Sequence, residues 1–185
     1  MSTFWEVERQ SELLKPVLVT TAEVEDQFDT ESVFLHWLAE VITGDRLLAE
    51  SCVTDARNIA SRRAGLFVEW LTQWARAATI QCAIDRTHKE ILAAAYEYKD
   101  FRCSHGGHAP LSAEEVSALQ GIPIHEITTT LDPFVRAVMI LRGIPHCAIQ
   151  DCALRLRTTR LAVCAGCCVA AQWLQGRCAR DGMCP

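Results

Sequence analysis

The sequence has few aromatic residues and no long apolar run. Aromatic side chains make up 7% of its 185 residues, and glycine-flanked, β-branched runs are scarce, which argues against an all-β sandwich or barrel. The longest apolar run, from Leu161 to Ala171, falls short of the ~20 residues that a membrane-spanning helix needs. Any apolar signal segment near the start is interrupted by four charged residues, Glu6, Glu8, Arg9 and Glu12. We therefore expect a soluble, cytoplasmic protein that makes no contact with a membrane.

Motifs of catalysis are missing as well. The sequence offers no nucleophile beside a recognisable base, no paired-carboxylate motif and no glycine-rich loop that would cradle a phosphate. We therefore expect neither enzymatic activity nor a cofactor. Half of the residues are hydrophobic, which excludes a disordered chain and indicates a globular protein.

Acidic and basic residues are divided unevenly along the chain. The first 130 residues hold 11 basic and 20 acidic side chains. Residues 131–185 hold 7 basic side chains, all of them arginine, and 3 acidic ones. An acidic first part and an arginine-rich second part suggest two functional halves, of which the second faces an anion.

The chain contains ten cysteines, which we expect to be reduced thiols that pack as small hydrophobic side chains. A zinc or thiol switch in the last helix is the alternative for Cys164, Cys167 and Cys168, since Cys178 and Cys184 would complete a four-ligand site. No turn of the kind that zinc knuckles use interrupts the predicted helix, so we predict no metal. A further possible ligand set, around a glycine pair that is typical of a plain loop, consists of Cys103, His105 and His108.

The strongest periodic signal is helical, and it occurs in two blocks. In the first block, the pattern predicts a helix that Asp29 or Thr30 caps and Gly44 ends, a second helix that Asp45 caps, and a third after residues 61–65. The apolar stripes of these helices consist of Val33, Phe34, Trp37, Leu38, Val41 and Ile42; of Leu48, Cys52 and Val53; and of Phe67, Trp70, Leu71, Trp74, Ala77 and Ala78. Because none of the three can bury its stripe alone, we expect a bundle.

The periodicity fades between residues 98 and 130, which we interpret as a linker with at most one short helix, after Ser112. In the second block, Asp132 is placed to cap a helix that has Pro133 at its first position and ends at Gly143. A short helix and a last helix that Gly176 ends follow. The inward residues of these three helices are Phe134, Val135, Val138 and Leu141; Ile149, Cys152, Ala153 and Leu156; and Val163, Cys167, Ala170 and Leu174. We predict an all-α protein with two small helical domains, 1–97 and 131–185, joined by the linker 98–130.

The short helix, the break at residues 157–159 and the last helix form a candidate helix-turn-helix. Ala153 is small where the two helices cross, and Thr159 can cap the second helix. Arg155, Arg157 and Arg160 lie where DNA phosphates would run if the second helix entered a major groove. Any two amphipathic helices joined by a short turn produce the same pattern, so the pattern alone does not establish DNA binding.

This segment, "LDPFVRAVMILRGIPHCAIQDCALRLRTTRLAVCAGCCVAAQWL", resembles region four of bacterial RNA polymerase sigma factors of the extracytoplasmic-function type. The family pattern runs L-P-x-x-x-R-A-V-x-x-L-R and, after a turn, E-x-A-x-x-L-x-[small polar]-x-x-x-V. The matching residues are Leu131, Pro133, Arg136, Ala137, Val138, Leu141 and Arg142, then Ala153, Leu156, Thr158 and Val163. The earlier "ITGDRLLAESCVTDARNIA" is similar to the T-G-D-x-x-x-A-E-D-x-x-Q-E-x-F of region two, and "FVEWL" to its F-x-x-W-L. The two regions follow one another in the family's order.

The resemblance implies a sigma-factor-like transcription initiation protein that binds core RNA polymerase and promoter DNA. It assigns contact with the polymerase to three acidic residues, Asp45, Glu50 and Asp55. It assigns contact with the melted promoter to Trp70, Trp74 and Arg76. Stacking an unpaired base on an aromatic side chain contributes ~1–3 kcal/mol per base. At least one of the two tryptophans is expected in the core instead. It assigns the upstream promoter element to Arg155, Arg157, Thr158, Thr159, Arg160 and Cys164. An anti-sigma protein is a further partner that the family implies.

The sequence also departs from the family pattern. Ser51, Thr54 and Arg57 stand where the family has Asp, Gln and Phe. Cys164 and Gly166 stand where its recognition helix usually carries Lys and Arg, and a glycine there weakens a helix by ~1 kcal/mol. The loss of two cationic donors weakens DNA binding. The alternative interpretation is therefore a degenerate regulatory or interaction protein that keeps the sigma fold without promoter recognition.

Overall fold

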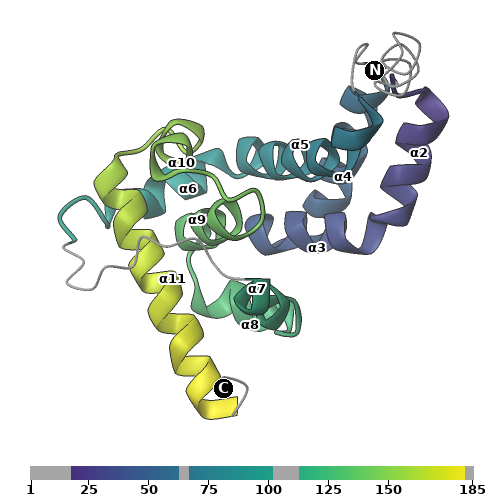
Figure 1. Ribbon diagram of the computed structural model, residues 1–185. Helices are drawn as coiled ribbons and strands as arrows, with labels where there is room; N and C mark the ends of the chain where they lie inside the picture. Colours follow the sequence, from purple (N-terminus) through teal and green to yellow (C-terminus); the bar gives the residue numbers. More distant parts are fainter. Residues whose placement is uncertain (1–17, 63–66, 102–112, 182–185) are drawn as a thin grey trace, which may run out of the picture.

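The computed structural model describes residues 18–62, 67–101 and 113–181, and every regular element within these ranges is a helix (Figure 1). In chain order the helices are α2 (Thr21–Thr30), α3 (Ser32–Thr43), α4 (Arg46–Ser61), the 3₁₀ helix η1 (Val68–Trp70), α5 (Leu71–Arg86), α6 (His88–Tyr96), α7 (Ala113–Gln120), α8 (Ile124–Thr130), α9 (Pro133–Gly143), α10 (Ile149–Arg155) and α11 (Arg160–Asp181). The all-α prediction is confirmed. Among the described helices, none has both the length and the apolar character to span a membrane.

Two predicted helix starts are confirmed by their hydrogen bonds. Asp45 precedes α4, and its Oδ1 accepts a hydrogen bond from the backbone N–H of Leu48 at 2.9 Å. Asp132 precedes α9, and its Oδ1 accepts from two backbone N–H groups in the first turn at 2.9 and 3.0 Å. Pro133 occupies the first turn of α9, where its missing N–H costs no hydrogen bond. These signals were readable because a capping residue acts within its own turn.

The predicted caps of α3 were wrong because the sequence analysis missed α2. Thr20 and Glu23 form a reciprocal capping box that starts α2 at Thr21. Asp29 and Thr30 consequently belong to the last turn of α2 rather than to the start of α3. The N-cap of α3 is Glu31, which makes no side-chain capping hydrogen bond.

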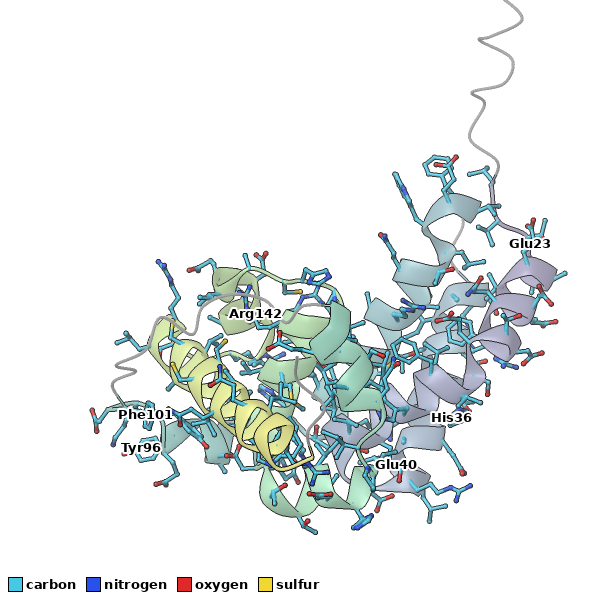
Figure 2. The ribbon with its side chains drawn as sticks, turned by 60° about the horizontal axis from the view of Figure 1, so that its bottom comes forward. Glu23, His36, Glu40, Tyr96, Phe101 and Arg142 are labelled. Atoms are coloured by element: carbon cyan, nitrogen blue, oxygen red, sulfur yellow. The ribbon has the colours of Figure 1, made fainter. Side chains whose placement is uncertain are left out.

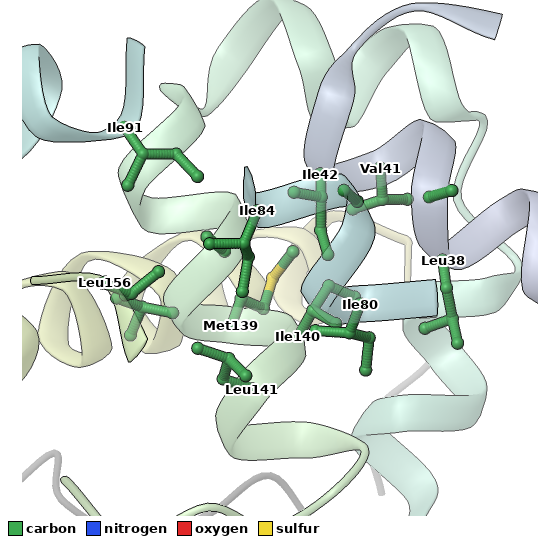
Figure 3. Packing of buried hydrophobic residues seen from close by; sticks show 14 of the residues in the cluster. Leu38, Val41, Ile42, Ile80, Ile84, Ile91, Met139, Ile140, Leu141 and Leu156 are labelled. Atoms are coloured by element: carbon green, nitrogen blue, oxygen red, sulfur yellow. The ribbon is translucent and has the colours of Figure 1, made fainter. Parts of the chain in front are cut away.

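Helix α9 lies at the centre of the molecule, with α3 and α5 on one side and α10 and α11 on the other (Figure 1). All of its residues from Phe134 to Gly143 are buried. A helix that is buried all round must have neighbours on every face, and α9 contacts helices of both predicted domains. Figure 3 shows the result, a single apolar cluster with side chains from α3, α5, α6 and α9. The described residues of the two predicted domains therefore share one core.

The segment expected to be a linker contains two helices, of which α7 is the short helix expected after Ser112 and α8 was not expected. The buried residues of this segment are Leu119 in α7, Ile122 in the turn and Ile127 in α8. Ile124, partly buried, also packs against the core, and so few apolar residues give no clear periodic signal in the sequence. The glycine and proline that suggested a linker, Gly121 and Pro123, lie in the turn between the two helices.

The contact between α3 and α9 is built on a glycine and a buried arginine. Gly44 ends α3 as predicted, with φ at 71°, a left-handed conformation that favours glycine. A Cβ atom at this position would lie 2.8 Å from Nη1 of Arg136. Arg136 is 5% exposed, and this burial lowers the pKa of its guanidinium, against the opposing effect of Asp132. The cation lies at the carboxyl end of α3, where the helix dipole stabilises positive charge.

Helix α11 crosses α9 closely and is longer than predicted. A Cβ atom on Gly166 would lie 3.1 Å from Cε1 of Phe134 and 3.2 Å from Cγ2 of Val138. The glycine that was expected only to weaken the helix thus permits a close helix crossing. Helix α11 continues past Gly176, because one glycine costs a helix only ~1 kcal/mol, and Arg177 in the next turn forms an ion pair with Glu126 of α8.

Candidate nucleic-acid interface

The candidate helix-turn-helix consists of α10, residues 156–159 and α11, and the two helices pack against each other. The inward residues predicted for α11 are confirmed, because Val163, Cys167, Ala170 and Leu174 are all buried. In α10, Cys152 and Ala153 are buried as predicted, as is Leu156 directly after the helix, and Ile149 is partly buried against the core. The amphipathic pattern therefore predicted correctly which faces of these helices point inward.

Backbone hydrogen bonds define the turn between α10 and α11. The N–H of Thr158 donates to the carbonyl of Ala153 at 2.9 Å, and the N–H of Arg157 to that of Leu154 at 3.2 Å. Arg157 has a positive φ of 51°, an uncommon conformation for a residue other than glycine. Thr159 accepts a hydrogen bond from the N–H of Ala162 at 3.1 Å, which confirms it as the cap of α11.

Three arginines, Arg155, Arg157 and Arg160, lie within six residues around this turn, and we call them the arginine edge. All three are exposed. Arg155 donates from Nη1 to Oε1 of Gln81 on α5 at 3.1 Å, so it also ties α10 to the first block of helices. Within the described part of the chain, neither Arg157 nor Arg160 forms an ion pair. Cys164, one turn into α11, is partly buried.

Two leucines flank the arginine edge and escaped the sequence analysis. Leu154 on α10 is 67% exposed, and Leu161 on α11 is 68% exposed. Their positions on the outer faces of the two helices follow from the helical period, but the absence of a covering element over them depends on the tertiary structure. The surface around the turn is therefore both basic and apolar.

Unlike the exposed arginines of the arginine edge, two of the three residues assigned to the melted promoter are held by contacts within the protein. Arg76 of α5 forms a bidentate ion pair with Glu31, at 2.7 and 3.0 Å, and lies over the ring of Phe34 at 4.7 Å. Trp74 is partly buried and packs against the core. Trp70, in the 3₁₀ helix η1 that precedes α5, is 56% exposed, so the expectation that at least one of the two tryptophans lies in the core is met by Trp74. The ring of Trp70 contacts Phe67 edge-on.

The exposed start of α4 carries two of the three acidic residues assigned to the polymerase. Asp45 and Glu50 are exposed, and Glu50 makes only a surface ion pair with Arg46 at 3.5 Å. Leu47 lies between them and is 76% exposed. Asp55, by contrast, forms an ion pair with Arg86 of α5 at the edge of a cavity of about 360 Å³. The structure thus places two of the acids with an exposed leucine and the third in the contact between α4 and α5.

The cysteines of α11 do not assemble into a metal site among the described residues, where no three potential metal ligands come together. Cys167 is buried, and Cys168 is disulfide-bonded, so the expectation of reduced thiols was wrong at this residue. Composition indicates the compartment of a protein and not the pairing of one particular thiol. The other residues of the two proposed ligand sets have no described side chains: Cys103, His105, His108, Cys178 and Cys184.

Comparison of the chain with known proteins gives no match to any family model, curated protein or solved structure. The functional argument therefore depends on the residues of this chain.

Proposed function

We propose that the protein is a sigma-factor-like transcription initiation protein whose arginine edge binds the phosphate backbone of double-stranded DNA. The arginine edge is the observation that carries the proposal. Arg157 and Arg160 are exposed and form no ion pair within the described chain, so no carboxylate of these residues competes with a bound anion for them. The turn that displays them is ordered by its own hydrogen bonds and by the Thr159 cap, so little conformational entropy is lost on binding.

A salt titration of duplex binding tests this proposal. Fluorescence anisotropy of a labelled duplex with the full chain measures how the logarithm of the association constant falls with the logarithm of the salt concentration. Each phosphate contact contributes ~0.9 to this slope. We expect Arg157→Ala and Arg160→Ala each to reduce the slope by about 1. Arg46→Ala, which removes an exposed arginine on α4, is the matched control and leaves the slope unchanged. A duplex affinity that is equal in all four proteins contradicts the proposal.

The second contact in this proposal is between the start of α4 and core RNA polymerase. An exposed leucine between two exposed acids supports it, since protein interfaces combine an apolar centre with a charged rim. We expect Leu47→Ser to lower the yield of complex with purified core polymerase by about tenfold. Val33→Ser, at a similarly exposed apolar residue on α3, serves as the control. Equal retention of both variants contradicts a contact at α4.

A second candidate function is an interaction protein on the same fold without promoter recognition. Leu154 and Leu161 favour it, because two leucines that are each about two-thirds exposed suit an apolar protein partner better than hydrated phosphates. The two functions predict different outcomes for one pair of variants. Leu154→Ser and Leu161→Ser leave duplex affinity within about twofold of the parent if the arginine edge binds DNA. Polymerase binding without any salt-dependent duplex affinity supports the interaction protein instead.

A further inference from the structure

Two cysteines meet where α9 passes into α10. Cys147 lies directly before Ala148, the N-cap of α10, and Cys152 is the fourth residue of that helix. The thiol of Cys152 donates a hydrogen bond to the backbone oxygen of Cys147, with its Sγ 3.8 Å from that oxygen. The two thiols are therefore neighbours, although four residues separate them in the sequence.

Packing explains part of this arrangement. The residue before an N-cap and the fourth residue of the helix commonly form an apolar contact that fixes how the chain enters the helix. Ala148 makes no side-chain capping hydrogen bond, so α10 relies on this contact between Cys147 and Cys152. Two thiols fulfil the role of two small apolar side chains here, but they also bring redox chemistry to the position.

The surroundings of the two thiols differ. Cys147 is partly exposed, whereas Cys152 is 0% exposed. Arg142 at the end of α9 (Figure 2) donates from Nη1 to the carbonyl of Cys147 at 2.5 Å. The hydrogen bond from Cys152, together with the charges of Arg155 and Arg142, lowers the pKa of Cys147 to about 7, against the effects of burial and of Asp151. The hydrogen bond with Cys147 and burial raise the pKa of Cys152.

We propose that Cys147 and Cys152 are a peroxide-oxidised dithiol, in which the partly exposed Cys147 is the attacking residue and the buried Cys152 the resolving one. The Cys147 thiolate attacks one oxygen of hydrogen peroxide, an S–O bond forms and the O–O bond breaks. The hydroxide that leaves takes up the proton that Cys147 released and becomes water. Cys152 then attacks the sulfenic sulfur of Cys147: the S–S bond forms, the S–O bond breaks and a second water leaves. Two thiols lose two electrons in total, and the peroxide is reduced to two waters.

A third thiol, that of Cys167, is the alternative partner for a disulfide with Cys147 or Cys152. Cys167 of α11 is buried, and its side chain is hydrogen-bonded to Arg142. The three thiols form no metal site, since no group of three potential ligands suits a metal ion within the described chain. The thiol of Cys152 already lies against the backbone of Cys147, so the first disulfide is expected between these two residues rather than to Cys167.

The disulfide would fix the start of α10 by a covalent bond where a hydrogen bond and apolar packing hold it in the reduced protein. Helix α10 also carries Arg155 and Leu154. Oxidation of the two cysteines would therefore act beside the surface that the proposed function uses. The chemistry itself does not depend on that function, and it can be tested without DNA or polymerase.

Peptide mapping tests the disulfide directly. Trypsin cleaves after Arg142 and Arg155, and the peptide between these sites contains Cys147 and Cys152 and no other cysteine. After treatment of the full chain with one equivalent of hydrogen peroxide, we expect this peptide to lose two hydrogens, and dithiothreitol to restore them. A cross-link of either cysteine to Cys167, or a sulfinic acid on Cys147 with Cys152 still reduced, overturns the proposal.

Alkylation rates and two variants separate the roles of the two thiols. At pH 7 we expect iodoacetamide to modify Cys147 roughly fivefold to tenfold faster than Cys82, a partly buried thiol whose pKa is raised. We expect Cys152→Ser to accumulate a sulfenic acid on Cys147 that dimedone traps, and Cys147→Ser to leave Cys152 unmodified by the same peroxide dose. Equal alkylation of Cys147 and Cys82, or peroxide oxidation of Cys152 in Cys147→Ser, contradicts the assignment.

Discussion

Two regions carry the side chains that the resemblance assigns to DNA, and they differ in what those side chains already bind. At the start of α5, Arg76 is held by a bidentate ion pair with Glu31 and covers an aromatic ring. Around the turn between α10 and α11, Arg157 and Arg160 have no such partner within the described chain. An arginine that is paired inside the protein supports the fold, whereas an exposed and unpaired one can bind a ligand without first losing a contact.

Among the contacts that support the fold, we expect the largest loss of stability from a substitution at Gly44. Gly44→Ala places a side chain in a left-handed conformation and 2.8 Å from the buried guanidinium of Arg136. We expect the free energy of unfolding to fall by about 2 kcal/mol, as measured by urea denaturation. A change below about 0.5 kcal/mol would show that the contact between α3 and α9 is looser than described.

A hydrogen bond to the cap of α9 gives the next largest effect. The hydroxyl of Tyr98 donates to Oδ2 of Asp132 at 2.5 Å. We expect Tyr98→Phe to lower the free energy of unfolding at pH 7 by about 1.5 kcal/mol, because the carboxylate loses a donor. Thermal denaturation followed by circular dichroism provides the measurement.

The raised pKa of Tyr98 is expected to make the stability of the protein depend on pH. Burial, followed by the hydrogen bond to Asp132, raises the pKa of Tyr98 above its usual 10.0. A raised pKa in the folded state means that this stabilisation is fully present below pH 10 and is lost as the pH rises above it. Above pH 10 the parent protein should therefore lose stability more steeply than Tyr98→Phe. Parallel curves would mean that the ionisation of Tyr98 is not linked to folding.

Alanine substitutions at two glycines of α11 are expected to change the stability of the protein in opposite directions. Gly166 faces Phe134 and Val138, which are fully buried and cannot move aside, so we expect Gly166→Ala to destabilise the protein by about 1 kcal/mol. A Cβ atom on Gly176 meets nothing within 4 Å, so Gly176→Ala should stabilise the helix by about 0.5–1 kcal/mol. If both variants are stabilised, α11 does not cross α9 as closely as described.

The smallest expected effect concerns the ion pair at the start of α5. Glu31→Gln removes a partly buried pair with Arg76, and we expect a loss of about 0.5–1 kcal/mol. Glu50→Gln removes a more exposed pair with Arg46 and should change stability by less than about 0.5 kcal/mol. Equal losses in the two variants would remove the distinction between a structural arginine and a surface one.

The sequence predicted features that depend on neighbouring residues and missed those that depend on distant ones. Asp45 and Asp132 were recognised because a cap acts within one turn, and the inward faces of α10 and α11 followed from the helical period. Val33 was placed on an apolar stripe but is 85% exposed, because the rotation of α3 is set by its neighbours. The pair of Arg76 with Glu31 spans 45 residues, a separation that no local pattern reveals.

In the candidate site, too, the sequence predicted only the features that depend on neighbouring residues. The arginines around the turn between α10 and α11 were found from their spacing alone. The burial of Arg136, by contrast, depends on helices that surround α9 on all sides, and no property of its own segment indicates it. Cys147 and Cys152 were not paired in advance, because their contact depends on the chain direction between α9 and α10.

Hydrogen–deuterium exchange of the full chain, with and without a DNA duplex at low salt, tests the central claim most directly. That claim is that the arginine edge binds DNA while the start of α5 belongs to the scaffold. We predict that the duplex slows exchange in residues 156–164 and leaves residues 70–77 unchanged. Protection of residues 70–77 without protection of residues 156–164 would contradict the account.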